Sequence, residues 1–197
     1  MIKCVYRRII QVEKLKDLNR RLERFRIQNN LEIPRVNYSV LLGFIELLDD
    51  AGSKSEIARI ASREDLNLDS LLPILESGEI LGLIKVQEGE VSMTQKAHFF
   101  IAASPKVRKK MLRDIIVNID IFKRIIDLIK QTEDGYVTKD ELSKYLSELQ
   151  IPFTTDTTEE YTSDFDSLIE WGRQALIFNY DANDERISFR DNVRQLC

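Results

Sequence analysis

The sequence predicts a mainly helical protein with small β-hairpins, arranged as two winged-helix domains in tandem. Helical spacing of apolar residues fills most of the chain, and two series of helices are each followed by a pair of short strand-like runs around a turn. Three helices followed by a hairpin is the winged-helix order. With 197 residues, of which 43% are hydrophobic and 31% charged, the chain can bury a core of ordinary globular size.

The N-terminal segment is expected to form a basic amphipathic helix followed by a linker. From Ile2 to Gln28 the chain contains no Gly or Pro, and apolar residues recur at intervals of three to five positions. Pro34 then ends the helix. Residues 1–35 carry ten Lys or Arg against four Asp or Glu. Leucines near heptad spacing would let this helix pair with a second copy, or it packs on its own domain.

The first predicted winged helix begins with an apolar helix from Tyr38 to Leu48, which Gly52 stops. A short helix around residues 57–60 follows, capped by Ser53 or Ser55.

A longer helix and a hairpin complete this domain. Asn67 or Asp69 can cap the helix, and Gly82 ends it. Two short runs then flank a turn that contains Gly89, as in a β-hairpin, and this hairpin is the expected wing.

The same order returns in the second half. A helical stretch over residues 105–131, broken near Asn118, precedes a helix that the capping box of Thr138 and Glu141 opens. After a Thr-rich acidic loop, a helix from about Glu159 to Ala175 leads into a second hairpin. The predicted domains are the basic helix and linker in residues 1–37, the first winged helix in 38–104 and the second in 105–197.

Two separate motifs carry a resemblance to a known family. The first runs from Leu71-Leu72-Pro73-Ile74-Leu75-Glu76 through Gly82 to Glu88-Gly89-Glu90-Val91-Ser92-Met93-Thr94. The second is Leu168-Ile169-Glu170-Trp171-Gly172-Arg173, followed by Phe178-Asn179-Tyr180-Asp181. Over about residues 38–190 the chain resembles the C-terminal AAA-associated domain, which follows the ATPase domain in some ABC-transporter ATP-binding proteins of the nitrate, sulfonate and taurine type.

The motif residues are expected to be structural: Pro73, Gly82, Gly89, Trp171, Gly172 and Arg173. We expect Trp171 to fill the junction of helix and hairpin, Gly172 to permit a close approach, and Arg173 to pair with an acidic residue.

The sequence lacks the residue patterns that an enzyme needs. It has a single histidine, two cysteines near opposite ends of the chain and no GxxxxGK[ST] loop, so we expect no catalytic residue, cofactor, metal or small-molecule substrate. By the resemblance, any ATP chemistry belongs to a partner chain, an ABC-type ATPase. No apolar run is long enough to span a membrane, and the mixed charges near the N-terminus do not suit a signal peptide, so a cytoplasmic location is expected.

The charges of the predicted helices bear on whether the protein binds DNA or another protein. The helix over residues 66–81 contains no Lys or Arg, and the helix over 159–175 has five acidic residues and only Arg173, so both are poorly suited to the major groove of DNA. The candidate patch for a nucleic acid or an acidic partner therefore lies elsewhere, in Lys106, Arg108, Lys109, Lys110, Arg20, Arg21 and Arg24.

We predict a non-catalytic regulatory or interaction module with a protein partner, or one that self-associates through its N-terminal helix. The alternative is a winged-helix DNA-binding transcriptional regulator that uses the basic patches.

Overall fold

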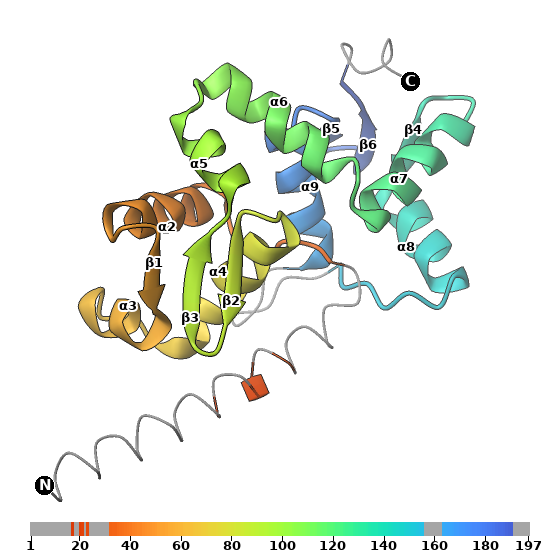
Figure 1. Ribbon diagram of the computed structural model, residues 1–197. Coiled ribbons are helices and arrows are strands. Elements are labelled where there is room, and N and C mark those ends of the chain that lie inside the picture. The colour runs from red at the N-terminus through yellow and green to blue at the C-terminus, as the bar shows by residue number, and fades with distance from the viewer. Residues whose placement is uncertain (1–16, 18–19, 22, 24–31, 156–162, 191–197) are drawn as a thin grey trace, which may run out of the picture.

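The computed structural model describes residues 17, 20, 21, 23, 32–155 and 163–190. This part of the chain is mainly helical, with two small antiparallel sheets of three strands each (Figure 1). The predicted mixture of helices and hairpins is thus confirmed. Most of the predicted N-terminal helix lies outside the described residues, and its described members, Asp17, Arg20, Arg21 and Glu23, are helical.

The first repeat, as we name the first series of elements, contains three helices and three strands. They are α2 (Tyr38–Asp50), β1 (Lys54–Glu56), α3 (Ile57–Arg63), α4 (Leu68–Ile80), β2 (Ile84–Gln87) and β3 (Glu90–Met93). The sheet order is β1-β3-β2. Glu88 and Gly89, with φ of 50° and 80°, form the two-residue turn between β2 and β3, in the left-handed conformation that tight hairpin turns favour.

The start of α3 differs from the prediction. Ser53 and Ser55 cap no helix, because residues 54–56 form β1 and pair with the outer edge of β3, with Lys54 opposite Ser92. The helix begins only after Glu56. Pairing satisfies backbone groups that β3 would otherwise leave unpaired at its edge, and this requirement outweighs the local capping preference of serine.

The second repeat follows the same order. Its elements are α7 (Asp120–Gln131), β4 (Tyr136–Thr138), α8 (Lys139–Glu148), α9 (Asp164–Gln174), β5 (Phe178–Asp181) and β6 (Arg186–Phe189), and its sheet order is β4-β6-β5. The predicted capping box is present: Glu141 N donates to Thr138 Oγ1, and Thr138 N donates to Glu141 Oε2. Helix α9 starts later than the predicted Glu159, because Ser163 is its N-cap; residues 159–162 lie outside the described residues.

Equivalent hydrogen bonds recur in the two repeats. Where α4 turns into β2, Leu83 N donates to Gly78 O at 2.8 Å; where α9 turns into β5, Ile177 N donates to Gly172 O at 2.8 Å. The start of each second helix is likewise tied to its hairpin turn, through Ile57 N to Gly89 O and Lys139 N to Glu185 O. The repeats therefore share local geometry as well as element order.

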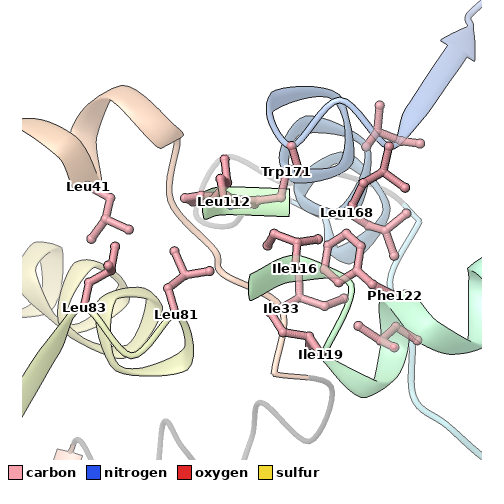
Figure 2. Packing of buried hydrophobic residues seen from close by; sticks show 14 of the residues in the cluster. Ile33, Leu41, Leu81, Leu83, Leu112, Ile116, Ile119, Phe122, Leu168 and Trp171 are labelled. Carbon is pink, nitrogen blue, oxygen red and sulfur yellow. The ribbon is translucent and has the colours of Figure 1, made fainter. Parts of the chain in front are cut away.

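Two helices connect the repeats: α5 (Gln95–Ala102) and α6 (Pro105–Ile116), and the predicted break near Asn118 separates α6 from α7. In Figure 1, α6 runs past α9 toward α7. Buried apolar side chains from both repeats and from α6 form one continuous cluster. Figure 2 shows part of it, with Leu41 of α2, Leu112 of α6, Phe122 of α7 and Trp171 of α9. The repeats are thus packed into a shared core.

Candidate functional site

The segment preceding α2 binds both repeats. Residues 33–38, which we call the junction segment, run between α4 and α9. Arg35 N donates to Ser77 Oγ of α4 at 3.0 Å, while Trp171 Nε1 of α9 donates to Val36 O at 3.0 Å. Tyr38 N donates to Glu170 Oε1 at 3.2 Å. The junction segment therefore holds α4 and α9 in a defined relative position.

Asp164 connects three parts of the chain at this junction. Its side chain is only 4% exposed and forms an ion pair with Arg35 at 2.9 Å between Oδ1 and Nη2. Its other oxygen, Oδ2, accepts hydrogen bonds from Thr154 N at 3.0 Å and Thr154 Oγ1 at 2.8 Å. These partners offset the cost of burying a carboxylate and tie the junction segment to the loop before α9. Arg35 and Asp164 were not among the predicted site residues, because nothing local links two positions so far apart in the sequence.

Helices α4 and α9 are largely buried. These are the two helices that the DNA-binding hypothesis would place in the major groove. In α4, all residues from Leu71 to Gly78 except the half-buried Pro73 are buried, including the acidic Glu76. In α9 the exposed residues are Asp166 and Arg173. Most of the surface of both helices is therefore covered, and the open part of α9 is the face that carries Asp166, Glu170 and Arg173.

The three residues of the Trp-Gly-Arg motif have different surroundings. Trp171 is fully buried, and its ring meets Tyr38 edge to face at a centroid distance of 6.0 Å, so the indole binds the junction segment, a contact that the sequence did not indicate. Gly172 lies against Phe178 of β5 so closely that a Cβ would overlap the phenyl ring. The side chain of Arg173 is exposed and forms no hydrogen bond or ion pair with any residue that the structure describes, so the predicted pairing with an acidic residue is not found among them.

The remaining motif residues shape the backbone of the first repeat. Gly82 has φ of 64° just after the C-cap of α4, and Gly89 has φ of 80° in the hairpin turn. Pro73 lies inside α4 and is half-buried. Gly82 and Gly89 adopt conformations that glycine accepts at the lowest cost.

A surface groove with a volume of about 570 Å³ lies between α6, α9 and β5. Its floor includes Ile169 and Phe178, and its charged lining residues are Lys109, Asp166, Glu170, Arg173 and Arg190. The groove combines one residue of the family motif with one residue of the predicted basic patch. The sequence could not indicate that these residues share a groove, because they come from different elements.

The predicted basic residues do not form one patch. On α6, Lys106, Lys109 and Lys110 are exposed, but Arg108 is turned inward, where it donates to Phe100 O at 3.0 Å and Ile101 O at 2.8 Å. These are carbonyls at the end of α5, which lacks backbone partners for them. Arg108 therefore caps α5 and contributes little to the exposed charge.

Of the predicted N-terminal arginines, Arg21 is bound at the start of α4. Arg21 donates from Nη1 to Asp69 Oδ1 at 2.6 Å at the start of α4, and Nε pairs with Asp17 at 2.9 Å. The hydrogen bond that Arg21 donates to Asp69 is the largest cause of the raised pKa of Arg21. Arg20 is helical, and Arg24 lies outside the described residues.

Two further observations concern only the residues that the structure describes. Among them, no three His, Cys, Asp or Glu side chains are grouped so that they could hold a metal ion. None of the described helices combines the length and the apolar character needed to cross a bilayer.

The junction segment holds the two helical repeats together, and a charged groove lies beside it. These features define a small helical module. The family model of the C-terminal AAA-associated domain matches residues 58–181, so the protein belongs to this family, as its motifs predicted. The family is a non-catalytic accessory module associated with ABC transporters. Searches of curated proteins and of solved structures each found no match.

Proposed function

We propose that this protein is a non-catalytic interaction module that binds a protein partner, an ABC-type ATPase, and regulates or assembles it. Membership of a family associated with ABC ATPases supports this partner. The observation that carries the proposal is the burial of α4 and α9 in the junction. A helix already packed on most sides cannot enter the major groove without breaking the core.

Electrostatics support the same proposal. The part of α4 that faces the interior holds Glu76, and Asp164 at the start of α9 is bound to Arg35. Opening the junction to expose these helices would separate a buried ion pair and bring carboxylates toward phosphates. Binding of a protein surface to the outside of the module requires no such opening.

We also propose that each repeat is a winged helix, with boundaries at residues 38–104 and 105–197. Support comes from the shared order of helix, strand, two helices and hairpin, and from the three-stranded sheet in each repeat. Superposition of an experimental structure on winged-helix domains tests this assignment. A different path of the chain between α3 and the hairpin would contradict it.

The partner is tested with the purified full chain and the ATP-binding subunit of a nitrate-, sulfonate- or taurine-type ABC transporter that lacks a domain of this family. Size-exclusion chromatography with light scattering should show a complex of the two proteins, and ATP hydrolysis by the subunit should change on binding. If neither a complex nor a change in hydrolysis is found across a concentration series into the micromolar range, the proposed partner is wrong. Light scattering on the chain alone reports self-association.

DNA binding remains the second candidate because Lys106, Lys109 and Lys110 are exposed on α6. We measure binding of labelled non-specific duplex DNA across a salt series, beside a variant with these three lysines changed to Gln. Binding that weakens steeply with salt and is lost in the variant would favour DNA binding as the function. Absence of binding at low salt would exclude it.

A further inference from the structure

We propose that the groove between α6, α9 and β5 binds an acidic peptide segment of the protein partner, an inference that rests on the proposed function. The segment places its carboxylates among Arg173, Arg190 and Lys109. The basis is a set of cations that line one groove and whose side chains have no partner among the residues that the structure describes.

The three cations meet near the C-terminal end of α9. Arg173 lies in its last turn. Arg190 follows β6, and its N donates to Ile177 O at 3.0 Å, just beyond the end of α9. Lys109 lies one helical turn before Arg113, whose Nε donates to Ala175 O at 3.2 Å. The three residues therefore come from separate elements that meet at this end of α9 and line the same groove.

These cations are open in a region that is otherwise acidic. Residues 131–197 contain six Lys or Arg and fifteen Asp or Glu. Two of the other cations there are engaged: Lys139 lies over the ring of Phe165 at 5.2 Å, and Arg186 pairs with Asp184 at 3.2 Å. By contrast, the side chains of Arg173, Arg190 and Lys109 form no hydrogen bond or ion pair with the described residues. An incoming carboxylate would relieve the mutual repulsion of these cations.

The groove also contains two acidic residues. They favour a peptide over a nucleic acid as the ligand of the groove. Asp166 and Arg173 lie in the first and last turns of α9, roughly 10 Å apart at the helical rise per residue. Glu170 Oε1 accepts a hydrogen bond from Tyr38 N, and Asp166 Oδ2 accepts one from Ser163 Oγ. A uniformly charged phosphate backbone would be repelled at the Asp166 end, whereas a peptide can carry carboxylates at one end only.

The groove offers little apolar surface. Ile169 and Phe178 line it, but only 6% and 0% of their surface is exposed. Recognition in the groove therefore depends on charge, because a peptide side chain would find almost no exposed apolar surface to cover.

The test uses a fluorescein-labelled peptide, Glu-Glu-Leu-Glu-Glu-Leu, and the full chain, with fluorescence anisotropy measured at low salt. We expect saturable binding that Arg173→Gln combined with Arg190→Gln weakens at least tenfold. Lys109→Gln alone should weaken it less. The matched control is Lys106→Gln combined with Lys110→Gln, which removes the same number of charges from α6 outside the groove and should leave binding unchanged. Urea unfolding midpoints check that each variant is folded.

Three outcomes would overturn the inference: no binding of the peptide, equal binding of the peptide with Gln in place of Glu, or equal weakening by the control pair. The inference would also be overturned if the protein bound duplex DNA more tightly than the peptide and lost this DNA binding in the variant Arg173→Gln with Arg190→Gln. The complex with the ATPase subunit is measured in parallel. If that complex forms and survives Arg173→Gln with Arg190→Gln, the groove proposal fails while the proposed function stands.

Discussion

At the scale of single residues, two glycines show how closely helix and strand approach in each repeat. A Cβ at Gly78 would lie 2.7 Å from Ile84 Cδ1, and one at Gly172 would overlap the ring of Phe178. The Phe178 ring is itself fixed, because it stacks on Phe122 at 6.3 Å and is fully buried. A Cβ at Gly172 would therefore force the ring out of these packing contacts.

We expect Gly172→Ala to lower the free energy of unfolding by about 1–3 kcal/mol, because the added methyl group overpacks a closed core. Gly43→Ala is the matched control: Gly43 lies in α2 with no atom within 4 Å of the added Cβ. This control should raise stability by up to about 1 kcal/mol, since alanine favours a helix over glycine. Urea unfolding followed by circular dichroism measures both, and equal gains would show that the approach to Phe178 is not restrictive.

At the scale of elements, the capping box of α8 predicts a pH dependence. Thr138 N donates to Glu141 Oε2 at 2.8 Å and Thr138 Oγ1 donates at 2.9 Å. These bonds favour the ionised carboxylate and lower the pKa of Glu141 below its ordinary value of 4.5. A group with a lowered pKa in the folded state stabilises the fold above the unfolded-state pKa. This contribution is lost as pH falls through the folded-state pKa.

Glu141→Gln should therefore lower the free energy of unfolding at pH 7 by up to about 1 kcal/mol, as for the loss of a helix cap. The difference from the original chain should shrink as pH falls from 5 toward 3. Urea titrations at several pH values measure the difference. Glu148→Gln, at the other end of α8, is the control, and its difference in free energy of unfolding from the original chain should not shrink over this pH range. A difference for Glu141→Gln that stays constant over the same range would contradict the prediction.

At the scale of the whole molecule, the junction segment couples the two repeats. One continuous core, the Arg35–Asp164 ion pair and the Trp171–Val36 hydrogen bond all cross between them. Unfolding one repeat would expose the buried surface of the other. A single cooperative transition is the expected consequence.

Trp171 makes this expectation measurable, because it is the single tryptophan of the chain and lies at the junction. Tryptophan fluorescence reports the junction, and far-UV circular dichroism reports all helices. We expect the two signals to change at the same urea concentration in the original chain, and to shift together in Asp164→Asn. A fluorescence transition that clearly precedes loss of helix would show that the repeats unfold separately.

Elements whose signals are local could be predicted from the order of residues alone. The cap of α4, predicted at Asn67 or Asp69 and found at Asn67, the Glu88-Gly89 turn and the Thr138 capping box each depend on groups within a few residues of one another. The printed order of residues is therefore enough to predict such features. The two sequence motifs were likewise enough to place the chain in its family.

Contacts between groups far apart in the sequence could not be predicted, because they depend on how the elements pack. Strands β1 and β4 are three residues long and exist through pairing with strands far along the chain, so Ser53 and Ser55 looked like caps. The inward turn of Arg108, the meeting of Arg35 with Asp164 and the gathering of Arg173 with Arg190 follow from packing of separate elements. Local sequence carries no record of such contacts, because their free energy arises only when burial of the shared core brings the elements together.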